Sequence, residues 1–229
     1  VMAIRAEEGG SWFSGRHGGH LGSRAVLGRL WKEELHTAYH NHFEKSAYEV
    51  IKDAGFDPDA IANEPRYLDP KRIKGYCELH IEQGPILEAE GVDIGVVTHG
   101  QGLNWIQVTL TGRESHTGST PMPMRRNAGL GMARVTELVH KIAMKNQPEA
   151  VGAVGQCNVY PNSRNIIPGK VVFTIDFRSP SFDTQDRMEE EFNEGAKQIA
   201  KELDLEIEME KVGHFDPVTF DQGCIDAIK

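Results

Sequence analysis

Strict alternation of apolar and polar residues predicts half-buried β-strands in the second half of the chain. Trp105–Thr111 alternates at every position, and Lys170–Arg178 alternates between a fully apolar face and a largely polar face. Further strands are predicted at Ala153–Tyr160 and Glu206–Val212. Half-buried strands of this kind are typical of an antiparallel sheet.

Two predicted helices separate these strands. Arg126–Met144 carries apolar or small residues at helical spacing, and Asp183–Leu203 has the pattern of a long acidic helix with Asp183 as its N-cap. The resulting order, β-α-β-β-α-β, is the split ferredoxin-like arrangement. We expect it to cover residues 103–213.

The part of the chain before residue 100 follows a different pattern. An apolar strand at Val1–Arg5 precedes the glycine-rich loop Glu7–Gly22, and further strands are predicted at Tyr76–His80 and Asp93–Thr98. A short helix at Pro85–Glu90 joins the last two, and such a strand–helix–strand unit indicates a mostly parallel sheet with helices on its faces. We therefore predict an α/β fold class, with a partial doubly wound domain interrupted by an α+β ferredoxin-like domain.

Charge and cysteine content narrow the range of partners. The formal net charge is −9, so the chain has no general basic surface for nucleic acid. The 3 cysteines are widely spaced and fit neither a disulfide framework nor a zinc knuckle, which indicates a reducing compartment and favours the cytoplasm. No apolar run approaches the roughly 18 residues of a transmembrane helix, so we expect no membrane partner.

Carboxylates and an imidazole follow two of the predicted strands. Glu7 and Glu8 come after the first strand, and His80 lies between two glutamates at the end of a later one. Ligands of open α/β sheets bind at the carboxyl ends of strands. Adjacent carboxylates repel each other unless a cation or a shared proton separates them. The pattern indicates a metal site, and the alternative is a solvated strand end.

Four longer segments resemble a known enzyme family. They are AEEGG at 6–10, ELHIEQGP at 78–85, GRESHTGSTPM at 112–122 and PNSRNIIPGKVVFTIDFR at 161–178. The chain resembles the dinuclear metal amidohydrolases related to glutamate carboxypeptidase and aminoacylase. Within them it is most similar to the branch of N-carbamoyl-L-amino-acid hydrolase, β-ureidopropionase and allantoate amidohydrolase.

The resemblance implies a metal centre. Glu7 matches the general base that takes a proton from the metal-bound water, and Glu8 and His80 match metal ligands. A metal-bound water has a lowered pKa, so a nearby carboxylate can accept its proton. The implied cofactor is a pair of divalent ions, and the ligand types suit zinc, manganese or cobalt without deciding between them.

The resemblance also implies a substrate-binding set. His116 matches the catalytic histidine that donates to the scissile carbonyl oxygen, and in relatives this residue reaches the active site of the partner subunit. Asn165 and Arg178 match residues that hold the substrate carboxylate, for which arginine is well suited. The alternative for Arg178 is a surface ion pair with Asp176. Gln83 either contacts substrate or caps the following helix.

The implied function is metal-dependent hydrolysis of a linear C–N bond in an N-carbamoyl-L-amino acid or β-ureido acid, giving an amino acid, ammonia and carbon dioxide. The alternative substrates are allantoate, ureidoglycolate or an N-acyl amino acid. The implied domains are part of a metal-binding catalytic domain at 1–102, a lid or dimerisation domain at 103–213 and a return to the catalytic domain at 214–229. The implied partner is a second copy, bound through the lid domain.

The residue patterns at both ends of the chain predict that it is an internal fragment of a longer enzyme. Val1–Ile4 has the pattern of a buried central strand with nothing before it, and the chain stops inside the helix-like pattern at Cys224–Lys229. The family's His-x-Asp segment before Glu7 and its histidine beyond residue 229 lie outside this sequence. The hypothesis from a different class is therefore a non-catalytic dimerising fragment with an incomplete metal site.

Overall fold

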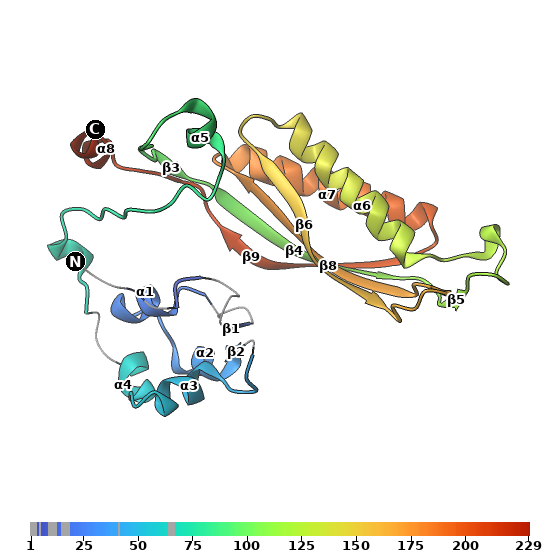
Figure 1. The fold of residues 1–229 in the computed structure, drawn as a ribbon, viewed down its shortest axis with the longest axis horizontal. Coiled ribbons are helices and arrows are strands. Elements are labelled where there is room, and N and C mark those ends of the chain that lie inside the picture. The colour runs from blue at the N-terminus through green and yellow to red at the C-terminus, as the bar shows by residue number, and fades with distance from the viewer. Residues whose placement is uncertain (1–3, 5, 9–12, 15–18, 41, 64–66) are drawn as a thin grey trace. The chain divides into compact units, whose positions relative to one another are not determined.

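The chain packs as two compact units, one within residues 1–81 and one within residues 82–229 (Figure 1). The computed structural model describes residue 4 and residues 6–8, 13–14, 19–40, 42–63 and 67–229. Most of the strand predicted at Val1–Arg5 lies outside the described residues. Each unit has an apolar core of its own.

Short helices around a small core make up the first unit. Its elements are β1 (Phe13–Ser14), α1 (Leu21–Val26), α2 (Lys32–Thr37), β2 (Tyr39–His40), α3 (Ala47–Asp53), α4 (Pro58–Asn63) and a 3₁₀ turn at Pro70–Arg72. Their core contains Phe13, Leu21, Leu30, Leu35, Ala38 and Ala47. A capping box starts α3, because Ser46 Oγ accepts from the Glu49 N–H and the Glu49 carboxylate accepts from the Ser46 N–H.

The strands predicted at Tyr76–His80 and Asp93–Thr98 are not formed. Neither segment is paired with a strand, and Leu79 is 98% exposed. Both segments contain apolar residues suited to a strand, but ladder hydrogen bonds need a neighbouring strand, and none of the described residues provides one. The short helix predicted between the two segments is confirmed as α5 (Ile86–Glu90).

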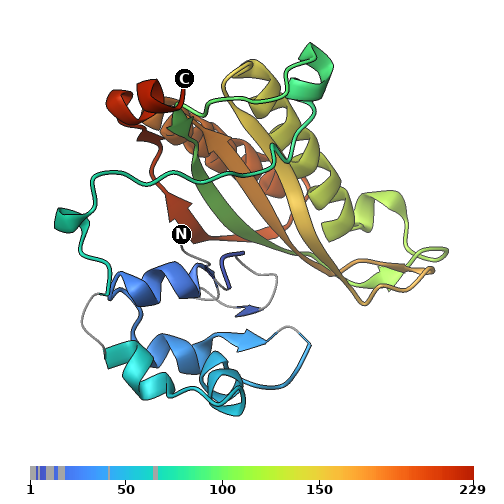
Figure 2. The same cartoon turned by 60° about the vertical axis from the view of Figure 1, so that its left-hand side comes forward.

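The second unit is built on an antiparallel sheet that two long helices cover on one face (Figures 1 and 2). Its main elements follow the chain order β4 (Gly102–Thr111), α6 (Ala128–Lys145), β6 (Val151–Tyr160), β8 (Lys170–Ser179), α7 (Phe182–Glu202) and β9 (Glu206–Phe215). In space the strands lie in the order β6-β8-β4-β9. The predicted β-α-β-β-α-β arrangement is therefore confirmed.

Side-chain caps set where the long helices begin. Asn127 caps α6 through its side-chain oxygen. Ser181 Oγ accepts from the Thr184 N–H and caps α7. The prediction of Asp183 as N-cap is therefore wrong. Its carboxylate lies in the first turn of α7 instead, where the helix dipole favours negative charge.

The core of the second unit lies between the sheet and the helices. It takes alternate residues from β4 and β8 and one side of each long helix, including Val108, Leu110, Phe173, Phe177, Val135, Val139, Met188 and Phe192. No helix among the described residues of the second unit covers the opposite face of the sheet, which carries Asp176 and Arg178. The two edge strands of the sheet are β6 and β9.

Two short ribbons lie at opposite ends of this sheet (Figure 1). The remaining elements are β3 (His99–Gly100), which pairs with β10 (Val218–Thr219), β5 (Ser115–His116), which pairs with β7 (Ile166–Ile167), α8 (Gln222–Ile228) and a 3₁₀ turn at Met122–Met124. Among the helices of the described residues, none is both long and apolar enough to cross a membrane.

Candidate active site

Two backbone hydrogen bonds join the segment of the paired acids to the start of α1. The carbonyl oxygen of Glu7 accepts from the His20 N–H at 3.1 Å, and that of Ala6 accepts from the Leu21 N–H at 3.0 Å. The Glu7 carboxylate lies 3.5 Å from Nδ1 of His20, while Glu8 is exposed. The pairing of Glu7 with His20 was not predicted, because the two residues are 13 positions apart and no local pattern links them.

The segment that carries His80 lies within electrostatic reach of Glu7. The Tyr76 hydroxyl donates to Glu78 at 2.6 Å, and this hydrogen bond is the main reason that the pKa of Tyr76 is raised. The negative charge of Glu7 raises that pKa further. This effect concerns Tyr76, four residues before His80.

The geometry of His80 leaves one ring nitrogen free for a ligand. Nδ1 lies 2.6 Å from the carbonyl oxygen of Ile81, and a carbonyl oxygen can only accept a hydrogen bond, so Nδ1 carries the proton. The lone pair of the neutral ring then lies on Nε2, as in histidines that bind a metal through this atom. The ring is exposed.

The described residues do not assemble a complete metal centre. No group of three or more histidine, cysteine, aspartate or glutamate side chains among them is placed to hold a metal ion. Glu8 and His80 are donors of the right chemical type, but a catalytic site needs about three protein ligands. The roles of Glu7, Glu8 and His80 therefore remain predictions.

Glu82, rather than Gln83, caps the helix after the ELHIEQGP segment. Its carboxylate accepts from the N–H groups of Ile86 and Leu87 at 3.1 and 3.2 Å. The capping alternative for Gln83 is therefore wrong. Gln83 is exposed and has a φ of 53°, in the left-handed region that residues other than glycine rarely adopt. Its substrate contact remains a prediction.

The ribbon of β5 and β7 brings His116 and Asn165 together. His116 pairs in register with Ile166, and the Thr117 N–H donates to the carbonyl oxygen of Asn165 at 2.9 Å. Nδ1 of His116 accepts from the N–H groups of Gly118 and Ser119, at 3.1 and 3.3 Å. In the neutral ring the proton must then lie on Nε2, which becomes a hydrogen-bond donor.

Arg178 lies on the open face of β8, next to Asp176. Its Nε donates to the Asp176 carboxylate at 3.0 Å and its Nη2 at 2.8 Å, so the ion pair that the sequence left as an alternative is present. This hydrogen bond is the main reason that the pKa of Arg178 is raised, and the group stays charged. The side chain is still 45% exposed, which leaves guanidinium N–H groups for a second carboxylate.

His116 and Arg178 lie at opposite ends of the sheet. The ribbon of β5 and β7 adjoins the Lys170 end of β8, whereas Arg178 lies at the other end of that strand (Figure 1). Lys170 and Arg178 are eight residues apart, which corresponds to about 27 Å along an antiparallel strand. A small ureido acid cannot bridge this distance, so the two residues of one chain do not meet at one substrate.

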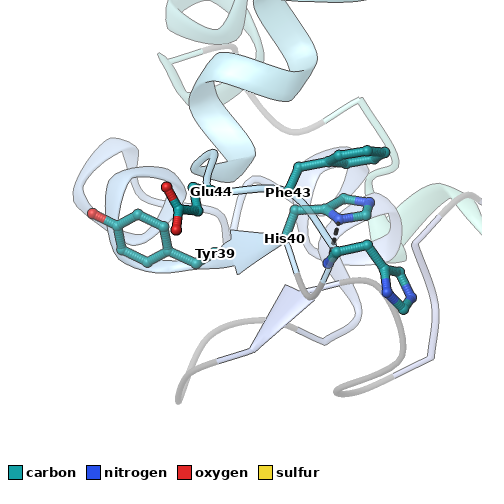
Figure 3. Close-up of a pocket in the computed structure, with 5 residues that line it drawn as sticks. Tyr39, His40, Phe43 and Glu44 are labelled. Atoms are coloured by element: carbon teal, nitrogen blue, oxygen red, sulfur yellow. Dashed lines mark hydrogen bonds between the residues drawn. The ribbon is translucent and has the colours of Figure 1, made fainter.

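A pocket in the first unit contains none of the predicted site residues (Figure 3). Tyr39, His40, His42, Phe43 and Glu44 line it. The ring of His40 packs against Phe43 at a centroid distance of 4.6 Å, and its Nδ1 accepts from the His42 N–H at 3.1 Å. These contacts give His40 a packing role in β2.

Comparisons with known proteins agree with the resemblance seen in the sequence. Residues 98–204 match the family model of a peptidase dimerisation domain. An N-carbamoyl-L-amino-acid amidohydrolase of Rhizobium meliloti is 57% identical over 159 residues, which are 69% of this chain and 38% of that protein. An N-carbamoyl-L-amino acid amidohydrolase of Geobacillus stearothermophilus is 34% identical over 229 residues, which are 100% of this chain and 53% of that protein.

The similarity extends to solved structures and to enzymes with other names. An amidase of the hydantoinase/carbamoylase family from Burkholderia multivorans has a TM-score of 0.78 and 38% identity, over 97% of this chain and 52% of that one. Allantoate amidohydrolase of Escherichia coli is 32% identical over 181 residues, which are 79% of this chain and 43% of that protein. The chain spans about half the length of the curated relatives that it matches.

Proposed function

Because this chain belongs to the family of N-carbamoyl-L-amino-acid amidohydrolases and their allantoate-hydrolysing relatives, we propose that the whole protein hydrolyses the linear C–N bond of an N-carbamoyl-L-amino acid. The products are an amino acid, ammonia and carbon dioxide. The relatives with this name and with up to 57% identity support this substrate class over the alternatives.

Three residues carry the proposed chemistry. Arg178 binds the substrate carboxylate, and Glu7 takes a proton from the attacking water and passes it to the leaving nitrogen. His116 donates its Nε2–H to the carbonyl oxygen as that oxygen gains negative charge. The water oxygen bonds to the ureido carbon, and the bond to the terminal nitrogen breaks and releases ammonia. The carbamate that remains loses carbon dioxide and leaves the amino acid.

Glu8 and His80 are the residues of this chain that would hold a divalent cation. The support is chemical, because a carboxylate and an imidazole with a free Nε2 are donors that zinc, manganese and cobalt accept. When bound, such a cation polarises the carbonyl group and lowers the pKa of water. The described residues do not supply a third ligand beside them.

The separation of His116 from Arg178 is the main support for an active site that is formed by two copies of the chain. Since the two residues of one chain lie at opposite ends of the sheet, a site that uses both must take them from different copies. The match to a peptidase dimerisation domain supports a second copy of this chain as the partner. Closed two-fold dimers are the commonest oligomers of soluble proteins.

The charges on the two sheet edges favour β6 as the pairing strand. β9 carries Glu206, Glu208 and Glu210, and charged residues of this kind protect an edge from pairing. β6 contains no charged residue along its length from Val151 to Tyr160. An uncharged, exposed edge strand can add a copy of itself and extend the sheet.

Antiparallel pairing of β6 with its copy accounts for a site with contributions from both chains. Val151 is in register with Arg178, and Tyr160 is in register with Lys170. β7 lies in the segment of the chain between Tyr160 and Lys170. In an antiparallel pair, the Val151 end of one β6 lies beside the Tyr160 end of the other. Arg178 of one copy therefore lies on the same side of the dimer as His116 and Asn165 of the partner.

Substrate tests on the full-length protein examine this function directly. We expect turnover of N-carbamoyl-L-amino acids with a divalent metal present, and much weaker turnover of allantoate, ureidoglycolate and N-acyl amino acids. A preference for allantoate would show that the alternative substrate of the same family is the correct one. A full-length, metal-loaded protein that hydrolyses none of these compounds would contradict the proposal.

Loss of the guanidinium at Arg178 is expected to weaken substrate binding. Because hydrogen bonds between charged groups contribute about 1.5–3 kcal/mol each, Arg178→Gln should raise KM by roughly 10- to 100-fold. The same change should matter little for a substrate analogue whose carboxylate is replaced by a carboxamide. Steady-state kinetics on both compounds check the prediction.

Arg164 provides the matched control, because it is an exposed arginine next to Asn165 in the sequence. Arg164→Gln should leave KM close to the wild-type value. If Arg164→Gln raised KM and Arg178→Gln did not, the carboxylate role would belong to Arg164.

A further inference from the structure

The loop that carries His116 is held by an arginine that the sequence did not single out. Arg125 is half-buried, and its Nε donates to the carbonyl oxygen of Thr120 at 3.0 Å while its Nη2 donates to that of Thr117 at 2.7 Å. We propose that Arg125 is a positioning residue for His116, which it acts on through the loop backbone. This inference rests on the proposed function, in which His116 is the hydrogen-bond donor to the substrate carbonyl.

The imidazole itself is fixed by the backbone directly after it. The N–H groups of Gly118 and Ser119 both donate to Nδ1 and leave Nε2–H as the free donor. The loop also passes close to the ring, since a Cβ atom at position 118 would lie 3.2 Å from Cε1 of His116. The aim of Nε2–H therefore depends on where the backbone of residues 117–120 lies.

Arg125 fixes that backbone at both of its ends. Thr117 is held on one side by its N–H bond to Asn165 and on the other by its carbonyl bond to Arg125. Thr120 donates its N–H to the carbonyl oxygen of His116 at 3.2 Å, and its own carbonyl accepts from Arg125. A planar guanidinium holds two acceptors in a fixed relation, which a lysine ammonium on a flexible stem does not do.

The expected consequence is a loss of rate without a loss of affinity. In Arg125→Gln the loop can move, and a misplaced catalytic group costs up to about 100-fold in rate, so kcat should fall by about 10- to 100-fold. KM should change little, because the substrate carboxylate is bound by Arg178, which hydrogen-bonds to Asp176 and not to the loop that carries His116. Arg125→Lys, which keeps the charge but not the planar geometry that holds both carbonyl groups, should give an intermediate kcat.

Arg126 provides a matched control on the next residue. Its Nε donates to the carbonyl oxygen of Asp204 at 2.5 Å and lies 3.0 Å from the Asp204 carboxylate, away from the His116 loop. Arg126→Gln removes the same kind of side chain and the same number of charges. It should leave kcat and KM near the wild-type values.

The test combines kinetics with hydrogen exchange on the full-length dimer. For Arg125→Gln we expect the lower kcat, an unchanged KM and faster amide exchange in a peptide that spans residues 116–120, with unchanged exchange in the strands of the sheet. Wild-type exchange in that peptide, an unchanged kcat, or an equal loss in Arg126→Gln would each overturn the proposal. A wild-type protein without ureidohydrolase activity would contradict the proposed function. Amide exchange does not depend on the substrate, so it would still show whether Arg125 holds the loop.

Discussion

Two lysines in the middle of β6, Gln156→Lys with Asn158→Lys, are expected to separate the dimer and remove the activity with it. Residues near the middle of a strand that pairs with its own copy across a two-fold axis lie close to their counterparts, and like charges there oppose pairing. Each site then loses the donor that the partner's His116 provides. Because removal of one such donor costs about 10²- to 10³-fold in kcat, the monomer should be nearly inactive.

Sedimentation and turnover, measured on the same samples, check this prediction. Glu208→Lys on the opposite edge is the control, because it also adds two units of positive charge but lies on β9. That variant should remain dimeric and active. A monomeric β6 variant with full activity would show that each chain makes a complete site, and dissociation by the β9 change would show that the other edge is the interface.

Replacing the proposed base by its amide, Glu7→Gln, is expected to lower kcat by about 10²- to 10⁴-fold, the range typical of general acid–base groups. The glutamine keeps the size of the side chain and can still contact His20, which lies 3.5 Å from the Glu7 carboxylate, so the local structure should persist. KM should change little, because the carboxylate contacts of the substrate are left intact. Steady-state kinetics of the full-length protein measure the effect.

Metal content distinguishes Glu7 from its neighbour. Glu7→Gln should bind as much divalent metal as the wild type, whereas Glu8→Gln should lose metal and activity together. Elemental analysis of the purified variants gives this readout. Full metal binding in Glu8→Gln, or metal loss in Glu7→Gln, would reverse the roles assigned to the two carboxylates.

The sheet of the second unit could be predicted from the sequence because its four strands pair with one another within the chain. The alternation in Trp105–Thr111 and Lys170–Arg178 gave both the strands and the faces, and the helices followed from their apolar spacing. The segment at Tyr76–His80 is also predicted to be a strand, but it has no strand partner among the described residues. Periodicity identifies a segment suited to a strand, whereas a strand exists only where another one pairs with it.

The candidate site was predictable in its residue types but not in its contacts. The motifs indicated His116 and Asn165 separately, and only the pairing of β5 with β7 shows that they are neighbours. The alternation placed Arg178 and Asp176 on one face, and the ion pair between them follows from that spacing. Arg125 lacked any signal, because it contacts backbone carbonyl oxygens whose positions no local pattern specifies.

The central claim is that Arg178 and His116 act on one substrate from different copies of the chain, and mixed dimers test it most directly. We expect low activity from the homodimers of Arg178→Gln and of His116→Ala. The two variants can be co-expressed with different tags, and the mixed dimer can be isolated. In a two-fold dimer that shares residues across the interface, one of its sites combines an intact Arg178 with an intact His116, so activity should return to about half of the wild-type value. A mixed dimer as inactive as both parents would contradict the claim, because every site would then draw the two residues from the same chain.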